Sequence, residues 1–421
     1  MSTIPFTPPK ARPYSPQGPP ADIVVLPVAR QATLPAARPV PVFPSSPLAA
    51  HIVDDVAPAG STSTAIVYCE ANFGAIDGKT ANGLIRHSEK YEVLSVIDSE
   101  KAGQDTGMVL DGIPNGIPLC SSLADALRQA GDTPDQFIFG MAPASGMMSP
   151  HERSIVLEAM TQGMNIVNGL HEFLNDDAEF VAAGIASNVT IQDVRKPRDK
   201  KDLRMFSGRI NDVTCPRIAV LGTDCAIGKR TTATILTRAL NDAGLKAVLI
   251  GTGQTGLMQG ARYGIALDAV PSQFCAGELE AIILEAYEAE RPDVIIIEGQ
   301  GALSHPAFST TSFILRGSCP QAVVLQHAPG RAARCDFEKM RMPEAATEIN
   351  LIQTFSKTKV IGLTINHENM SDTDVDAAIG NYSRELGIPV TDALTRSPSD
   401  LLEMVAVAFP GLRVKSGTGQ L

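Results

Sequence analysis

The segment RIAVLGTDCAIGKRTTA (residues 217–233) carries the residues best suited to bind phosphate. Gly222 and Gly228 bound a loop between an apolar run and a helical pattern that starts at Lys229. Such a loop turns backbone N–H groups and the positive end of a helix towards an anion, and the lysine adds a mobile charge. The spacing therefore predicts a phosphate-binding loop made of Gly222, Thr223, Asp224, Cys225, Gly228, Lys229, Arg230, Thr231 and Thr232.

This loop departs from the Walker pattern G-x-x-x-x-G-K-[ST] in two ways. The spacer between Gly222 and Gly228 is one residue longer, and Arg230 stands where the pattern has the hydroxyl residue that binds Mg²⁺. An arginine brings positive charge to phosphate without a metal ion. We therefore expect a loop that binds phosphate without hydrolysing ATP, and no protein-bound metal.

Candidate catalytic residues follow two other apolar runs. DVIIIEGQGALSHP contains Glu298 at the end of its run and His305 just beyond, and VVLQHAPGR places His327 at the end of the next run. Ligands of open α/β sheets bind beyond the carboxyl ends of the strands, where a carboxylate or imidazole can take a proton. We expect His305 or Glu298 to be the general base, with His327 as an alternate; ordinary loop histidines and a capping carboxylate are the structural alternatives.

Further side chains are placed where they could bind a small substrate. Arg331 and Arg334 are fixed cations close to a predicted strand end. Gln254 lies in the glycine-rich loop GTGQTGLMQG, where the backbone can approach a ligand closely. His171 and Arg195 follow strands of the first half of the chain and could line the region between the two halves. We predict that these five residues bind the substrate.

Cys225 offers a different chemistry within the phosphate loop. A thiol at a helix N-terminus has a lowered pKa and could accept an acyl group covalently. A small residue that lets the loop close would explain the cysteine equally well. Both interpretations stay open at the level of sequence.

Two successive sets of strand-length apolar runs and helical stretches surround these residues. The first set (61–208) includes TAIVYCEA, YEVLSVID, QFIFGMAP and NIVNGL, and the second (209–421) includes RIAVLG, KAVLIG, DVIIIEG, AVVLQ and KVIGLTIN. We expect helices to begin near Leu123, His151, Lys229 and Ala276. This alternation predicts an α/β fold, in which a Rossmann-like parallel-sheet domain precedes a P-loop NTPase-like α/β domain.

Residues 1–60 have a different composition, because they hold fourteen of the 30 prolines. Proline interrupts both helices and strand ladders, and the segment has little to bury. We predict a disordered, Pro-rich tail; a polyproline ligand for a partner protein is the alternative.

The composition of the 421 residues narrows the class of protein. Net charge is −11 and the pI is about 5.2, which argues against nucleic acid or an anionic membrane as partner. No apolar stretch is long enough to span a bilayer, and no signal peptide is evident. The seven cysteines are scattered, without a C-x-x-C pair. We expect a cytoplasmic enzyme that acts on a small molecule and forms a homo-oligomer.

The motifs together resemble known families. GTDCAIGK followed by VIIIEGQG resembles the dethiobiotin synthetase branch of P-loop proteins. With AIDGKTANGLIR, IVNGLHEFL, DVRKP, GTGQTGLM and IEGQGALSHP added, residues 61–415 resemble the DgcN-like D-glutamate N-acetyltransferase family, formerly a domain of unknown function.

This resemblance implies an acyltransferase that moves an acetyl group from acetyl-CoA to the amino group of D-glutamate, in D-amino-acid catabolism. The phosphates of CoA would suit the predicted loop as well as those of ATP. One alternative is an ATP-dependent ligase or kinase of the dethiobiotin synthetase type, using ATP with Mg²⁺ on a small carboxylic acid. A nucleotide-binding module without catalysis is another.

Overall fold

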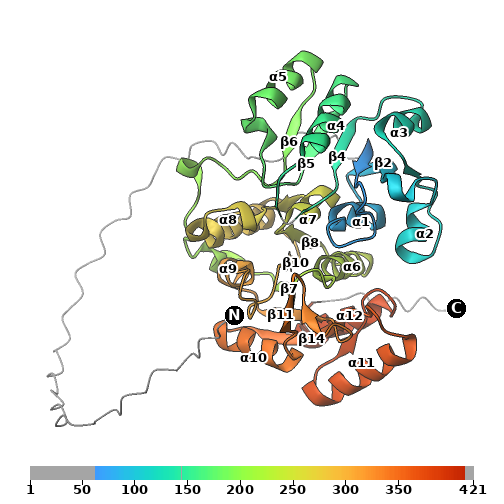
Figure 1. Ribbon diagram of the computed structural model, residues 1–421. Coiled ribbons are helices and arrows are strands. Elements are labelled where there is room, and N and C mark those ends of the chain that lie inside the picture. Colours follow the sequence, from blue (N-terminus) through green and yellow to red (C-terminus); the bar gives the residue numbers. More distant parts are fainter. Residues whose placement is uncertain (1–61, 144, 413–421) are drawn as a thin grey trace, which may run out of the picture. The chain divides into compact units, whose positions relative to one another are not determined.

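The computed structural model describes residues 62–143 and 145–412. The predicted Pro-rich tail, residues 1–60, lies outside this range. Two parallel sheets organise the described chain, the first within residues 63–193 and the second within residues 217–391 (Figure 1). Among the described residues, no helix combines the length and the apolar character needed to cross a membrane.

The first sheet has six parallel strands in the order β3-β2-β1-β4-β5-β6. This order is that of the Rossmann dinucleotide fold, in which the order of the strands reverses between β1 and β4. The strands are β1 Ser63–Tyr68, β2 Tyr91–Ile97, β3 Leu119–Cys120, β4 Gln136–Phe139, β5 Asn165–Asn168 and β6 Ile191–Asp193. Its helices are α1 Lys79–Arg86, α2 Thr106–Asp111, α3 Leu123–Ala130, α4 Pro150–Thr161 and α5 Ala178–Ser187.

The second sheet has seven parallel strands in the order β15-β14-β11-β7-β10-β8-β9. Its strands are β7 Arg217–Gly222, β8 Ala247–Gly251, β9 Tyr263–Gly264, β10 Val294–Glu298, β11 Ala322–His327, β14 Lys359–Ile365 and β15 Val390–Thr391. A separate antiparallel hairpin joins β12 Ala333–Arg334 to β13 Phe337–Arg341.

Seven helices accompany the second sheet among the described residues: α6 Lys229–Asp242, α7 Gln254–Gln259, α8 Ser272–Glu290, α9 Thr310–Ser318, α10 Ala345–Phe355, α11 Asp372–Leu386 and α12 Pro398–Ala408. Alternate residues of β7 face opposite layers. Ala219 and Leu221 pack in a core with α8, α9, α10 and α11, whereas Ile218 and Val220 pack with α6 and α12. Helices therefore cover both faces, which explains why this strand reads as a continuous apolar run.

Local sequence signals account for most helix starts. α3 and α6 begin at Leu123 and Lys229, as predicted. α4 begins at Pro150, one residue before the predicted start, because Ser149 and Glu152 form a capping box and proline suits the first helical position. α8 begins at Ser272, four residues before Ala276, and Pro271 is its N-cap residue.

Helix α1 joins the first sheet's domain to the second. The hydroxyls of Thr80 and Thr255 on α7 lie 3.1 Å apart, and the Gln259 amide donates to the carbonyl of Gly83. Gly83 also faces the guanidinium of Arg230, since a Cβ built there would lie 2.7 Å from two of its nitrogens. The start of α1 is thereby fixed beside α7 and α6.

Candidate functional site

The predicted phosphate loop runs from the end of β7 to the start of α6. Gly228 precedes α6 with φ +96°, a left-handed conformation that favours glycine. The Thr223 N–H donates to the carbonyl of Gln326 on β11 at 3.0 Å, so the loop leaves the sheet in a fixed direction. The order of strand, loop, Gly-Lys and helix that the sequence predicts is present.

Lys229 folds back over this loop. Its ammonium donates to the carbonyl of Asp224, and the residue is only 6% exposed. Burial lowers its pKa, while the nearby Cys225 and Asp224 act in the opposite direction. The ammonium is therefore held at the loop, where it can pair with a phosphate group.

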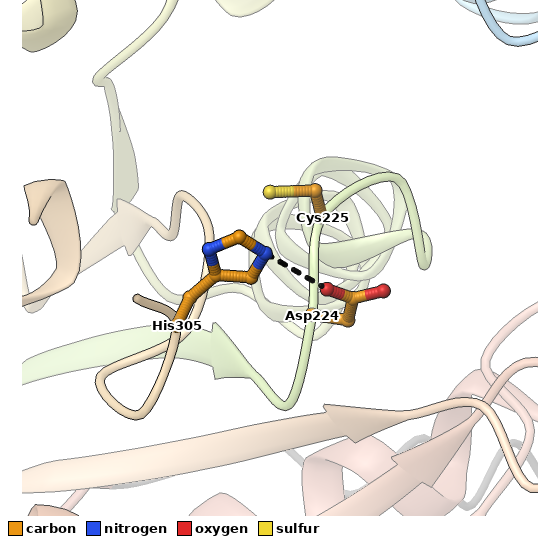
Figure 2. Close-up of side chains that lie close together, drawn as sticks. All are labelled: Asp224, Cys225 and His305. Atoms are coloured by element: carbon orange, nitrogen blue, oxygen red, sulfur yellow. Dashed lines mark ion pairs between the residues drawn. The ribbon is translucent and has the colours of Figure 1, made fainter. Parts of the chain in front are cut away.

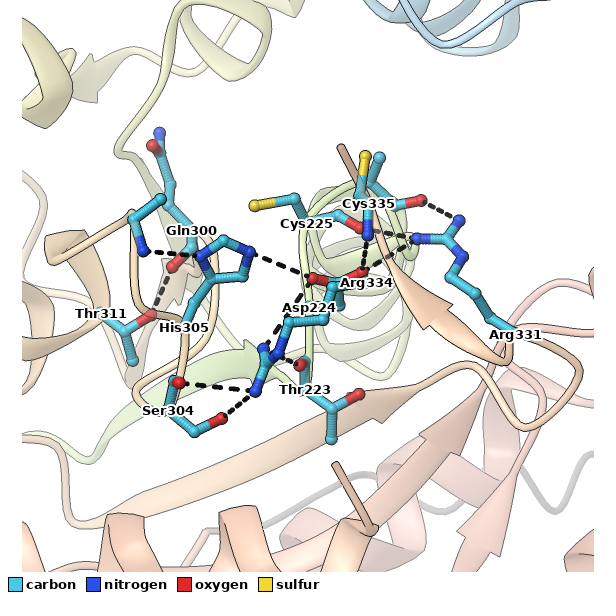
Figure 3. A network of polar contacts seen from close by, with 12 residues as sticks. Thr223, Asp224, Cys225, Gln300, Ser304, His305, Thr311, Arg331, Arg334 and Cys335 are labelled. Atoms are coloured by element: carbon cyan, nitrogen blue, oxygen red, sulfur yellow. Dashed lines mark hydrogen bonds and ion pairs between the residues drawn. The ribbon is translucent and has the colours of Figure 1, made fainter. Parts of the chain in front are cut away.

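Arg331 and Arg334 clamp the loop from the segment after β11 (Figure 3). Arg331 donates to Asp224 Oδ2 at 3.3 Å and to the carbonyl of Cys225 at 3.0 Å, and it pairs with Glu368 at 2.6 Å. Arg334 donates to the carbonyl of Thr223 at 3.2 Å. Because these guanidinium groups are bonded to the loop, the geometry favours a role in shaping it over the predicted binding of substrate carboxylates.

Asp224 and Cys225 of the loop lie close to His305, which follows β10 (Figure 2). One potential ligand atom from each lies within 4.8 Å of the others, and His305 Nε2 is 3.6 Å from Asp224 Oδ1. Both of those atoms are buried without a hydrogen-bond partner. The trio is therefore the place to test for a metal ion.

The surroundings of the trio do not suit a cation. The Asp224 carboxylate already pairs with Arg331 and Arg334, and Lys229 donates to the Asp224 backbone carbonyl. The Ala307 N–H donates to Nδ1 of His305 at 3.2 Å, so the neutral ring carries its proton on Nε2, the atom a metal would need. Burial and Arg334 lower the pKa of His305. The arrangement fits a neutral histidine that directs Nε2–H towards the Asp224 carboxylate.

His327 is also buried and fully engaged. Its Nδ1 lies 2.9 Å from the Thr223 hydroxyl and its Nε2 lies 3.2 Å from the Tyr382 hydroxyl. Burial lowers its pKa to about 4. With both ring nitrogens hydrogen-bonded, His327 supports the loop, and the geometry does not favour it as a base.

Glu298 ends β10 under the glycine-rich loop. Its Oε2 accepts from the Thr252 N–H at 2.9 Å, and a Cβ at Gly256 would lie 2.5 Å from the same oxygen. Burial raises its pKa, opposed by the charge of Arg230. Arg230 thus lies between Glu298 and α1, away from the loop that it was predicted to serve.

The remaining loop residues differ in their side-chain hydrogen bonds and in their burial. The Thr232 hydroxyl donates to Gln326 at 2.6 Å, which ties α6 to β11, whereas Thr231 has no such bond among the described contacts. Cys225 is half-buried, and burial raises the pKa of its thiol. A raised pKa disfavours the thiolate that covalent catalysis requires.

His171 and Arg195 belong to the first sheet's domain but meet the second. Arg195 donates to the carbonyl of Gly169 at 2.6 Å and pairs with Asp268. His171 Nε2 lies 3.8 Å from the same carboxylate. Gln254, at the start of α7, lies against Gly169. The structure therefore brings these three predicted residues together at the contact between the domains.

Sequence reasoning missed Lys79, the first residue of α1. It is exposed; its positive charge adds to the fall in the pKa of His171, which is caused mainly by burial, and opposes the rise in the pKa of Cys225. The Gly-Lys pair after a strand in AIDGKTANGL was the available signal.

The fold and the loop define a two-domain α/β protein, with a Rossmann-like domain followed by a P-loop domain. The sequence matches a family described as a domain of unknown function, DUF1611. Its Rossmann-like part matches residues 99–197 and its P-loop part matches residues 204–402. The chain belongs to this family.

Curated relatives carry a functional name. A protein named D-glutamate N-acetyltransferase from Pseudoalteromonas sp is 30% identical over 67% of this chain and 83% of its own length. A second with that name, from Tritonibacter scottomollicae, is 27% identical over 64% of this chain and 80% of its own length. A crystal structure of a DUF1611 family protein from Anabaena variabilis superimposes with TM-score 0.76 at 30% identity, covering 82% of this chain and 100% of that one.

Proposed function

We propose that this protein is an acyltransferase that moves the acetyl group of acetyl-CoA to the amino group of D-glutamate. The match to the relative named D-glutamate N-acetyltransferase, over 83% of that relative's length, carries this proposal. The matches to the Rossmann-like and P-loop domains of one family, residues 99–197 and 204–402, agree with it. Acyl transfer from CoA to an amine calls for an anion site and a proton acceptor.

The phosphate loop is the expected site for the pyrophosphate of CoA. Lys229 is held over the loop, and α6 begins directly behind it, so its N-terminal N–H groups and dipole face an anion. The residue after the lysine is Arg230, whose guanidinium lies by Gly83 instead of at the loop. No hydroxyl therefore follows the lysine directly to hold Mg²⁺, which favours a bound cosubstrate over ATP hydrolysis.

The reaction itself needs little beyond orientation and proton transfer. The amine nitrogen attacks the thioester carbonyl carbon, a C–N bond forms, and the C–S bond breaks. The ammonium of the free amino acid loses two protons overall: one ends on the CoA sulfur and the other passes to solvent. Two substrate carboxylates call for cations; Lys79 is exposed, and its positive charge acts on Cys225 of the loop.

Thiol release tests this function directly. Purified protein is mixed with acetyl-CoA and D-glutamate, L-glutamate or no acceptor, without ATP, and free CoA is followed with a thiol reagent. Release that depends on D-glutamate supports the proposal. No release with either isomer, together with ATP consumption when a carboxylic acid is supplied, would instead support the ATP-dependent ligase or kinase.

A further inference from the structure

Residues 366–368 follow β14 and lie beside the phosphate loop. The Asn366 N–H donates to the carbonyl of His327 at 2.7 Å, at the end of the neighbouring strand β11. The side-chain nitrogen of Asn366 lies 3.9 Å from the position of a Cβ built on Gly228. The residue that precedes His367 is therefore held at the start of α6.

Glu368, on the other side of His367, is joined to the same loop through Arg331. Its Oε2 accepts from Arg331 at 2.6 Å. Arg331 also donates to the carbonyls of Cys225 at 3.0 Å and Ala226 at 3.2 Å. Both sequence neighbours of His367 are thus tied to the phosphate loop, and these contacts place His367 at its edge.

A buried carboxylate orients the ring of His367. Nδ1 lies 2.6 Å from Oδ2 of Asp392, which follows β15 and whose side chain is 1% exposed. The Asp392 carboxylate also accepts from the Leu394 N–H and from the Thr395 hydroxyl, both at 2.9 Å. A carboxylate accepts hydrogen bonds and donates none, so Nδ1 carries a proton that points to Asp392.

The other ring nitrogen of His367 is free. Among the described residues, none forms a hydrogen bond with Nε2, and the side chain is 37% exposed. His327 differs because both of its nitrogens are bonded, and the His305 side chain is fully buried. In the imidazolium form both nitrogens donate, so Nε2–H of His367 is a charged donor suited to a phosphate oxygen.

CoA contains a phosphate that the loop does not account for. Its pyrophosphate is separated by the ribose from a further phosphate on the 3′ oxygen. Lys229 and the start of α6 offer one anion site, and Arg331 and Arg334 are bonded to loop carbonyls. The 3′-phosphate therefore calls for another cationic donor beside the loop.

We propose that His367, positioned by Asp392, binds the 3′-phosphate of CoA. This inference rests on the proposed function and names a residue that selects its cosubstrate. Nε2–H donates to a phosphate oxygen while Nδ1–H donates to Asp392, and no covalent bond changes. His367 thereby makes the protein prefer acetyl-CoA to the same thioester without its 3′-phosphate.

The test measures the affinities of the full chain for CoA and for 3′-dephospho-CoA by isothermal titration calorimetry. The wild type should bind CoA about 10-fold more tightly or better, because a hydrogen bond between charged groups is lost with the phosphate. His367→Asn keeps an amide nitrogen near the place of Nδ1, for Asp392, and has no donor at the place of Nε2. Its preference for CoA should fall to about twofold or less, with unchanged affinity for 3′-dephospho-CoA.

Three further variants separate the free nitrogen from the fold and from the loop. His367→Gln carries an amide nitrogen near the place of Nε2 and should keep more of the preference than His367→Asn. His151→Asn, which alters an exposed histidine of α4, should match the wild type. Lys229→Ala should weaken both ligands by similar factors, because both contain the pyrophosphate.

The outcomes discriminate between the two proposals. A wild type that binds neither ligand and releases no thiol from acetyl-CoA overturns both. Equal affinity of the wild type for CoA and 3′-dephospho-CoA overturns the role of His367 and leaves the acetyltransferase intact. A preference for CoA that His367→Asn retains in full overturns it as well, because another residue then binds the 3′-phosphate.

Discussion

At the scale of single residues, the loop is built by side chains that the sequence suggested for chemistry. His327, Arg331 and Arg334 donate to, or share hydrogen bonds with, the segment from Thr223 to Cys225. Their burial makes them poor candidates for contact with a substrate. Lys229 differs, because its ammonium is bonded to a single loop carbonyl and can exchange that partner for a phosphate oxygen.

Replacing Lys229 with alanine should weaken the binding of acetyl-CoA. A hydrogen bond to a charged group contributes about 1.5–3 kcal/mol, so the dissociation constant should rise by about 10-fold or more. Isothermal titration calorimetry measures it. Lys357→Ala, outside the loop, is the control, and equal affinity of the two variants would show that the loop does not bind the phosphates.

His327 should make stability depend on pH. Burial lowers the pKa of the native ring to about 4, whereas the ordinary pKa of histidine is 6.5. Between these values unfolding takes up a proton, so stability falls as pH is lowered from 6.5 to 4. The contribution of this residue to the free energy of unfolding falls by about 3 kcal/mol over this range. Urea unfolding at pH 7 and pH 4 should show a smaller loss in His327→Gln than in the wild type; equal losses would refute the role of burial.

At the scale of elements, the site depends on how closely β10 passes β7. A Cβ at Gly299 would lie 2.0 Å from the carbonyl oxygen of Val220, a backbone atom that cannot turn aside. This contact explains the glycine in the E-G motif that follows β10. The same strand end positions Glu298 beneath the loop at residues 251–256.

Gly299→Ala should therefore separate the two strand ends and destabilise the protein by about 1–3 kcal/mol. Chemical denaturation gives the change in the free energy of unfolding. Gly411→Ala is the matched control, because a Cβ there meets no atom within 4 Å. Stability equal to that of the control would mean that the backbone relaxes around the added methyl group.

At the scale of the whole molecule, contacts from α1, β5 and β6 hold the two domains together. Arg195 is 7% exposed and joins Gly169 of the first domain to Asp268 of the second. Thr80 and Gly83 of α1 add contacts with α7. His171 and the phosphate loop belong to different domains, so their separation depends on these contacts.

Arg195→Ala should weaken the junction. Loss of a charged hydrogen bond and an ion pair costs about 2 kcal/mol, and differential scanning calorimetry should show a lower melting temperature or two transitions. Arg128→Ala, which breaks an exposed pair with Asp125, should change stability by less than about 1 kcal/mol. Similar traces for the two variants would contradict a joining role for Arg195.

The sequence by itself determined the fold class, the alternation of strand-length apolar runs with helical stretches, and the glycine-bounded loop. Periodicity and turn residues are local properties, so apolar runs such as RIAVLG and the Gly-Lys pair at α6 could be recognised without tertiary information. Both predicted sheets are parallel, as expected. The family resemblance followed from the same local motifs and is confirmed by the match to both DUF1611 domains.

Only the tertiary structure decided which polar residues are free to act. Burial, and the partner that each nitrogen or oxygen meets, depend on segments far apart in the chain. His327 meets Thr223 across 104 residues, and Arg195 meets Asp268 across 73. No local pattern records such distances. For this reason the sequence could name histidines at strand ends, while the packing of two domains left His171 accessible and enclosed His305.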